Sequence, residues 1–210
     1  MANDQNRRPL ETRSRSWAQA LARALSASRV TPNAISVASV VFAALGSAVL
    51  LFSPGISGLV AAAACVQLRL LCNMLDGMVA IEGGRQTATG VLYNEIPDRI
   101  ADSLLIVALG VAAGAAWLGW LGALGAALTA YVRVLGGSLG LAQDFRGPLA
   151  KPHRMFVMTV GCLSGAVEIA LAGSRHSLLV AAWVVAMGAL LTCVARSLRI
   201  AAALRARAGT

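Results

Sequence analysis

Two polar stretches in an otherwise apolar part of the chain carry the side chains best suited to chemistry. The first stretch holds Asn73 and Asp76, and the second holds Asn94, Asp98 and Asp102. Within each stretch these residues are three or four positions apart, so on a helix they share one face. Oxygen ligands on two adjoining helices suit a hard cation such as Mg²⁺ or Mn²⁺, whose shell a phosphate completes. The spacing therefore predicts a site for a metal-held diphosphate.

Small residues accompany these oxygen ligands. Gly77 and Ala80 follow Asp76, and Gly90 lies four positions before Asn94. Residues with little or no side chain allow a bulky ligand to approach the helix backbone closely. A diphosphate held by a metal ion is a ligand of that size.

The order and spacing of these residues resemble the signature of the CDP-alcohol phosphatidyltransferase family, which reads here Asn73-x2-Asp76-Gly77-x2-Ala80-x9-Gly90-x3-Asn94-x3-Asp98. In that family, acidic residues occupy all four polar positions, whereas asparagine replaces the first and the third of them here. Ile81 stands where an arginine usually follows the alanine, and Asp102 is an additional acid one turn beyond the last.

The resemblance implies an enzyme of phospholipid biosynthesis that transfers a phosphatidyl group from CDP-diacylglycerol (CDP-DAG) to an alcohol and releases CMP. It implies Mg²⁺ or Mn²⁺ as cofactor, with Asp76 and Asp98 as ligands and the amide oxygens of Asn73 and Asn94 assisting. Asp98 stands at the family's fourth acidic position, where the residue accepts the proton of the attacking hydroxyl. Because two amides weaken the metal site, Asp98 could be needed as a ligand, which leaves Asp102 as the alternative base. The family also implies a homodimer.

A further set of residues is expected to bind the nucleotide. A threonine, a proline and an asparagine open the first long apolar run, where they mark a helix start, and in the resembling family this end lies near the cytidine nucleotide. The arginine in the Gly-rich connection at 82–89 is either a solvated loop residue or a diphosphate contact. With the small signature residues, the expected nucleotide contacts are Thr31, Pro32, Asn33, Gly77, Ala80, Arg85 and Gly90.

The composition indicates a membrane protein. Of the 210 residues, 58% are hydrophobic and 13% are charged, which is typical of an integral membrane domain and not of a soluble globule. The 18 basic residues outnumber the 9 acidic ones, and they gather at both ends of the chain and in short connections. Ends of this kind lie near anionic lipid on the cytoplasmic side, whereas nucleic-acid binding would need a basic surface interleaved with aromatic residues.

The apolar runs predict an all-α, polytopic membrane protein with six transmembrane helices. The predicted crossings are residues 34–52, 57–80, 90–117, 118–141, 155–172 and 178–194. Residues 1–30 are expected to form a polar tail and an amphipathic helix at 11–27 on the membrane surface, and 31–210 the membrane domain. Because basic connections alternate with nearly uncharged ones, we expect both termini on the cytoplasmic side of a bacterial-type inner membrane.

A cluster of cationic residues precedes the fifth predicted crossing. A loop on the cytoplasmic side explains such a cluster, and so does a pocket for an anion. An arginine inside the fourth crossing also needs an anionic partner. By similarity to the family, these residues would hold a phosphorylated acceptor such as glycerol phosphate. The expected contacts are Arg133, Arg146, Lys151, His153 and Arg154.

Two other functions fit the same residues. With two signature acids replaced by amides, the chain could bind the nucleotide lipid without turning it over, its acids forming a structural network with Arg69, Arg99 or Arg133. Intramembrane acids and arginines could also line the ion path of a small transporter. The small residues beside Asp76 favour the enzyme, because a bare ion does not need them.

Overall fold

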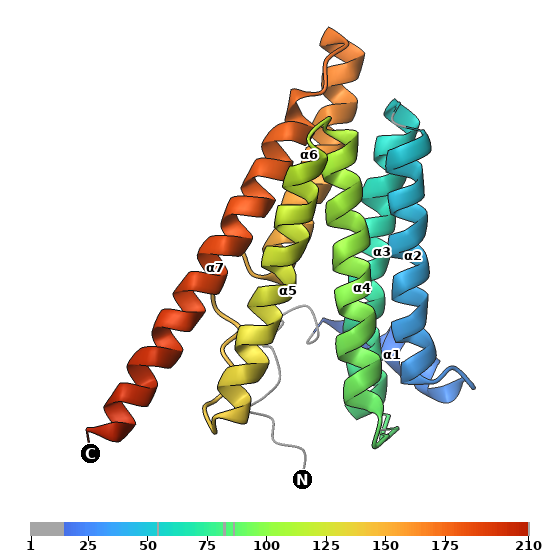
Figure 1. The fold of residues 1–210 in the computed structure, drawn as a ribbon. Coiled ribbons are helices and arrows are strands. Elements are labelled where there is room, and N and C mark those ends of the chain that lie inside the picture. The colour runs from blue at the N-terminus through green and yellow to red at the C-terminus, as the bar shows by residue number, and fades with distance from the viewer. Residues whose placement is uncertain (1–14, 54, 82, 86, 210) are drawn as a thin grey trace.

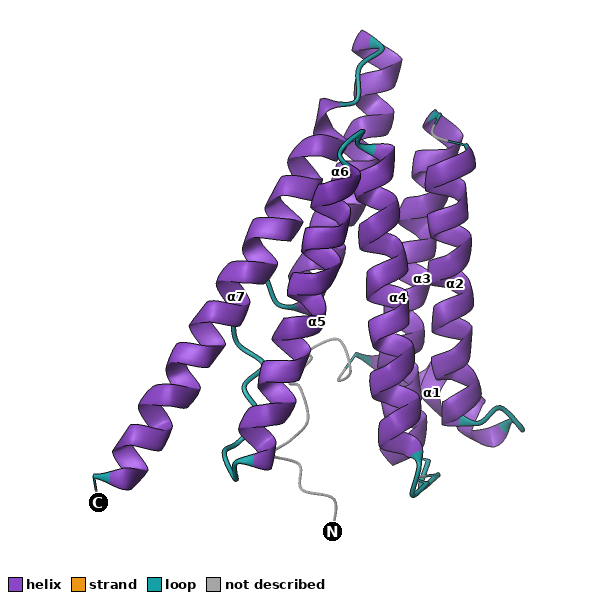
Figure 2. Cartoon of the chain, in the orientation of Figure 1, coloured by secondary structure: helices purple, strands orange, loops and turns teal. Residues whose placement is uncertain are grey.

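The structure, a computed structural model, describes residues 15–53, 55–81, 83–85 and 87–209, and these residues form helices and connections without strands (Figures 1 and 2). The all-α class predicted from the sequence is confirmed. The helices are α1 Ser16–Ala27, α2 Pro32–Phe52, α3 Ile56–Ile81, α4 Gly90–Ala112, α5 Ala116–Ser138, α6 Lys151–Ala172 and α7 His176–Ala208.

The long helices pack in a closed ring. Each contacts the next in the order α2, α4, α5, α7, α6, α3 and back to α2. Figure 1 shows α1, the α3–α4 connection and the C-terminal end of α7 at one end of the bundle. The α2–α3, α4–α5 and α6–α7 turns lie at the opposite end, the far end of the bundle. Between the helices, a core of buried side chains such as Leu105, Leu109 and Met158 runs toward the far end.

Five helices, α2, α3, α5, α6 and α7, are long and apolar enough to cross a membrane. The remaining predicted crossing, third along the chain, is α4, which is 23 residues long but carries Glu95, Asp98, Arg99 and Asp102. These charges make α4 too polar to count with the five apolar helices, although its C-terminal part contributes Leu105 to the apolar core. That α4 also crosses the membrane stays a prediction, supported by its place in the ring between α2 and α5.

The boundary between α4 and α5 differs from the prediction. The sequence predicts helices over 90–117 and 118–141, whereas α4 ends at Ala112 and α5 begins at Ala116. Gly114 lies between them with φ of 71°, in the left-handed region that favours glycine and ends a helix. The turn therefore falls earlier than the apolar run suggests, because an uninterrupted run of apolar residues does not reveal where it bends.

The connection from α5 to α6, residues 139–150, lies between α5 and α7 (Figure 1). The Leu149 N–H donates to Thr192 Oγ1 at 2.9 Å. Gly188 leaves room for Leu149, whose Cδ2 would lie 2.6 Å from a Cβ added at that glycine. As a result α6 begins beside the middle of α7, at Lys151 instead of the predicted residue 155. Lys151 and Arg154 are thereby placed beside the cavity within the bundle.

The N-terminal helix α1 packs Ala18 and Ala22 against α3. It leads into α2, whose first turn is capped by Thr31, since Thr31 Oγ1 accepts a hydrogen bond from the Ala34 N–H at 3.2 Å. Trp17 is exposed on α1. Whether α1 lies on a membrane surface stays a prediction, and residues 1–14 of the predicted polar tail lie outside the described residues.

Candidate functional site

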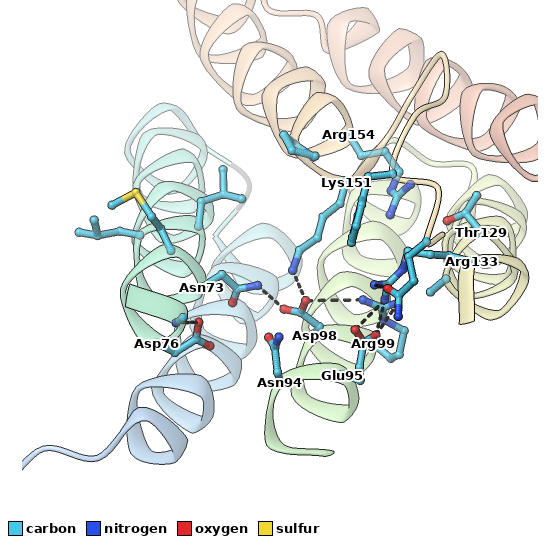
Figure 3. Close-up of a pocket in the computed structure, with 18 of the residues that line it drawn as sticks. Asn73, Asp76, Asn94, Glu95, Asp98, Arg99, Thr129, Arg133, Lys151 and Arg154 are labelled. Carbon is cyan, nitrogen blue, oxygen red and sulfur yellow. Dashed lines mark hydrogen bonds and ion pairs between the residues drawn. The ribbon is translucent and has the colours of Figure 1, made fainter. Parts of the chain in front are cut away.

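A cavity of about 890 Å³ lies among α3, α4, α5, the 139–150 connection, α6 and α7. It brings together residues from both polar stretches and from the basic cluster, as the close-up in Figure 3 shows. The sequence-predicted residues that line it are Asn73, Asp76, Gly77, Asn94, Asp98, Arg133, Lys151 and Arg154.

Asp98 is the carboxylate on which α3 and α6 converge (Figure 3). Its Oδ1 accepts a hydrogen bond from Asn73 Nδ2 and lies 3.3 Å from Arg69 Nη2. Its Oδ2 contacts Lys151 Nζ and lies 3.5 Å from Arg99 Nη2. Three of these four partners are cations, so most of the charge of this carboxylate is balanced by the protein itself.

Asp76 is buried and is held by the neighbouring helix α2. Ser36 Oγ donates to Asp76 Oδ2 at 2.6 Å, and the Gly77 N–H donates to Oδ1 at 2.6 Å. The sequence did not reveal Ser36 as a partner, because a serine in an apolar helix commonly bonds only to its own backbone. Asn94 is exposed and lines the cavity one turn before Asp98.

The donor set for a metal ion is smaller than the family signature implies. Within the described residues, no group of three or more His, Cys, Asp or Glu side chains is arranged to hold a metal ion. The two asparagines are the reason, since they leave Asp76 and Asp98 as the carboxylates of the signature. Two carboxylates with amide oxygens fit one hard dication that takes further oxygens from water and a bound phosphate.

Asp102 lies in a buried network one turn deeper along α4. Its Oδ1 is 2.6 Å from Arg69 Nη2 and its Oδ2 is 3.3 Å from Arg154 Nη2. All three side chains are at most 4% exposed, and they belong to α4, α3 and α6. Removing one member of such a network typically costs about 3–5 kcal/mol, because it leaves a charge buried without its partner.

The intramembrane Arg133 finds its anionic partner in Glu95. Its Nη2 donates to the two carboxylate oxygens of Glu95 at 2.6 and 2.7 Å, and its Nη1 donates to Gln143 Oε1 at 2.8 Å. The guanidinium also lies over the Phe145 ring, 5.1 Å from its centroid. The partner predicted for this arginine is therefore a carboxylate, and the pair joins α4 to α5.

Two predicted acceptor contacts lie away from the cavity. The His153 side chain is exposed, and so is that of Arg146, which pairs with Asp144 at 3.2 Å. Partial burial acts to raise the pKa of Asp144, but hydrogen bonds from the Arg146 backbone and from Arg199 outweigh it and hold the pKa below its ordinary value. Charge density along the sequence had suggested one cluster, but consecutive residues of a loop and a helix start point in different directions.

The predicted nucleotide contacts occupy the same end of the bundle but only Gly77 lines the cavity. Arg85 donates through Nη1 to the backbone carbonyl of Val30 at 2.9 Å. This bond holds the α3–α4 connection against the residues that precede α2, so Arg85 lies near Thr31. Gly90 and Ala80 are half-buried at the ends of α4 and α3.

Arg196 is a cavity residue that the sequence analysis missed. It is buried on α7, and its guanidinium donates to three carbonyl oxygens, those of Thr129 at 2.7 Å, Arg146 at 2.9 Å and Phe145 at 3.0 Å. Because Arg196 follows an apolar crossing, the sequence suggested only that it belongs to the basic end of the membrane domain. The available signal was its position at helical spacing from Thr192, another α7 residue that holds the 139–150 connection.

A comparison with models of protein families finds no match, and a comparison with curated protein sequences finds none either. Solved structures do match. Phosphatidylinositol phosphate synthase from Mycobacterium tuberculosis with CDP-DAG bound has a TM-score of 0.68 at 24% sequence identity, with 87% of this chain and 92% of that chain covered. The chain has the fold of this synthase.

Two further structures of the same synthase agree. The complex with manganese and citrate has a TM-score of 0.67 at 23% identity and covers 87% of this chain and 88% of that one. The apo form has a TM-score of 0.66 at 23% identity and covers 86% and 94%. The synthase is a CDP-alcohol phosphatidyltransferase, so the fold agrees with the resemblance at residues 73–98. At this identity the likeness is one of fold, and the chemistry depends on this chain's own residues.

Proposed function

We propose that the chain transfers a phosphatidyl group from CDP-DAG to an alcohol and releases CMP. The observation that carries this proposal is a cavity that joins Asp76 and Asp98 to cationic side chains. A diphosphate is bound by such cations, and a synthase with the same fold has CDP-DAG bound. The cationic residues that line the cavity are Arg99, Arg133, Lys151, Arg154 and Arg196.

The reaction requires an acceptor hydroxyl to attack the phosphatidyl phosphorus in line with the departing CMP. The hydroxyl proton passes to a base, a P–O bond forms to the acceptor, and the P–O bond to CMP breaks. The protein contributes positioning of the two substrates and fixed positive charge around the diphosphate. The cations of α4, α5, α6 and α7 face one cavity and so can provide both.

Mg²⁺ or Mn²⁺ is the proposed cofactor. The carboxylates of Asp76 and Asp98 would hold it, assisted by the amide oxygens of Asn73 and Asn94. When bound, the ion would neutralise the charge that develops on the CMP leaving group. The support is the oxygen-only donor set on α3 and α4, and a solved structure of the same fold in complex with manganese.

We assign the role of base to Asp98 and not to Asp102. Both carboxylate oxygens of Asp102 accept from guanidinium groups, and the residue is 3% exposed, so a substrate hydroxyl has no room beside it. Asp98 lines the cavity directly. On this assignment Asp102 anchors Arg69 and Arg154, and so positions the groups around Asp98.

The proposed acceptor is a phosphorylated alcohol such as glycerol phosphate. Arg133, Lys151 and Arg154 line the cavity on the side of α5 and α6, opposite the α3 residues. Three cations on one wall exceed what a neutral alcohol needs. The cytidine nucleotide is proposed to lie toward the start of α2, with Thr31, Pro32, Asn33 and Arg85 at its edge.

The proposed membrane arrangement rests on the basic charges at the end of the bundle that holds the site. We propose that α4 also crosses the membrane, which makes six crossings in all. We further propose that α1 lies on the membrane surface and that both termini are on the cytoplasmic side of a bacterial-type inner membrane. The support is the basic C-terminal end of α7, which Figure 1 shows at the same end as α1. A homodimer is proposed from the family resemblance alone.

The test is CMP release by the purified full chain in liposomes that contain CDP-DAG, with Mg²⁺ or Mn²⁺ and a panel of free and phosphorylated alcohols. We expect release that depends on the metal, stops with EDTA and is largest with a phosphorylated alcohol. Glu168→Gln, at the far end of the bundle, is the matched control and keeps the activity.

The inactive nucleotide-lipid binder is the second candidate, and one observation favours it. Asp98 and Asp102 are both engaged by cations of the protein, as in the structural network that this candidate requires. Saturable, metal-dependent binding of CDP-DAG without CMP release from any alcohol would support it in place of the enzyme.

A further inference from the structure

We propose that the site holds a single divalent cation and that the ammonium group of Lys151 takes the place of a second one. This inference rests on the proposed function and deepens it, because it states how the site compensates for its two missing carboxylates. Its substance is a matter of charge: amides stand at two signature positions that carry acids in the resembling family, and a fixed side-chain cation lies beside Asp98.

The first observation is the number of carboxylates. Asp76 and Asp98 are the two signature carboxylates that line the cavity, and each has its own partner: Ser36 on α2 for Asp76, and Lys151 on α6 for Asp98. Two dications would bring four positive charges to a set of two carboxylates. A site of that composition binds one such ion with the help of substrate phosphate, and a second would lack charged ligands.

The second observation is the position of Lys151. Figure 3 shows its side chain reaching from the start of α6 to Asp98. The ammonium contacts Asp98 Oδ2, and the Lys151 side chain is only 12% exposed. A compact ammonium presents three donors and no acceptor, so it can bridge a carboxylate and a phosphate as a metal ion does.

The third observation is the balance of charge around the cavity. Its described lining contains five basic side chains and three acidic ones, namely Asp76, Glu95 and Asp98. The lining is therefore cationic before any metal binds, which favours a diphosphate and opposes a second dication. Glu95 does not supply a further metal ligand, since both its oxygens accept from Arg133.

The backbone around Lys151 is held firmly enough for this role. Thr192 and Arg196 bind the carbonyl and N–H groups of the 139–150 connection, and Lys151 is the first residue after it. The charge is thus delivered to Asp98 by a segment fixed to α7. A flexible loop lysine would not compete with a metal ion in this way, because ordering it costs side-chain and backbone entropy.

The test counts metal ions directly. The full chain in detergent is titrated with Mn²⁺, with and without equimolar CDP-DAG, and free Mn²⁺ is followed by electron paramagnetic resonance. Detergent with CDP-DAG alone provides the blank. We expect one Mn²⁺ per chain. Asp76→Asn serves as the variant that lowers this binding.

Three variants examine Lys151. Lys151→Met removes the competing charge and should tighten Mn²⁺ binding by about tenfold or more, whereas Lys151→Arg keeps the charge and should leave it near the wild-type value. Asn94→Asp alone should still bind one ion, because Lys151 remains on Asp98. Asn94→Asp combined with Lys151→Met should bind two. Elution volume and thermal unfolding confirm that each variant is folded.

Two Mn²⁺ per wild-type chain, no Mn²⁺ binding at all, or unchanged affinity in folded Lys151→Met would each overturn the inference. Should Lys151→Met fail to fold, two ions bound by Asn94→Asp alone would overturn it, and one ion would support it. The proposed function is judged separately by CMP release. Two ions with CMP release would remove the inference and leave the transferase, whereas one ion without release would remove the transferase.

Discussion

The two ends of the helix bundle are held together by different forces. At the far end, α4 and α5 approach so closely that a Cβ added at Gly110 would lie 2.4 Å from the Gly119 nitrogen. Trp117 and Trp183 pack edge to face there, with ring centroids 5.2 Å apart. At the site end, charged side chains bridge the helices. The far end depends on shape, and the site end depends on balanced charge.

The acidic residue of the far end makes this contrast clear. Glu168 accepts hydrogen bonds from the backbone N–H groups of His176 at 2.9 Å and Ser177 at 2.8 Å, so it caps the start of α7. Asp98 and Asp102 instead accept from cations on other helices. An acid that satisfies a helix end has a structural task, whereas acids that gather cations beside a cavity can also serve a ligand.

The largest effect is expected from Asp98→Asn, which removes charge at the centre of the site. As the proposed base and metal ligand, Asp98 should account for a loss of about 10²–10⁴-fold in the rate of CMP release. Glu168→Gln should keep the rate, because it removes a similar charge from the far end. Equal rates of CMP release for Asp98→Asn and the wild type would contradict the proposed role of Asp98.

Asp102→Asn should act on stability first. It leaves Arg154 buried without its charged partner and Arg69 with only Asp98, at an expected cost of about 3–5 kcal/mol in the free energy of unfolding. Thermal unfolding in detergent measures this. Arg146→Met, which breaks an exposed pair, should leave the unfolding temperature almost unchanged. A normal unfolding temperature together with a lost rate would instead make Asp102 a group that acts in the reaction.

Arg196→Met should lower activity mainly by loosening the hold of α7 on the 139–150 connection. It removes two hydrogen bonds to the 139–150 connection, at Arg146 and Phe145, and a third to Thr129 on α5, so Lys151 would be held less firmly beside Asp98. We expect kcat/KM for the acceptor to fall by up to about a hundredfold, mostly through KM. Arg205→Met, exposed near the C-terminal end of α7, is the control. A fall confined to kcat would contradict the positioning role.

The smallest effect on activity is expected from Gly110→Ala. The added methyl group meets backbone atoms of Gly119, so α4 and α5 must separate slightly, at an expected cost of about 1–3 kcal/mol. CMP release per folded molecule should stay at the wild-type rate. A specific loss of activity would show that packing at the far end governs the geometry of the site.

Helices and their order were predictable because each long apolar run carries its own signal. The start of α2 at Thr31 and Pro32 shows this well, since cap and proline act within one turn. The bend at Gly114 and the start of α6 at Lys151 were not predictable in the same way. The first lies inside a continuous apolar run, and the second depends on where α7 holds the preceding connection.

By itself, the sequence determined that this is an all-helical protein with polar signature positions on two consecutive helices, because helical periodicity and spacing are local properties. Tertiary structure alone decided which cation meets which acid. Arg69 and Arg154 meet at Asp102, Lys151 meets Asp98, and Arg196 holds the segment between them. These partners are 33 or more positions apart along the chain, and only the ring of packed helices brings them within reach.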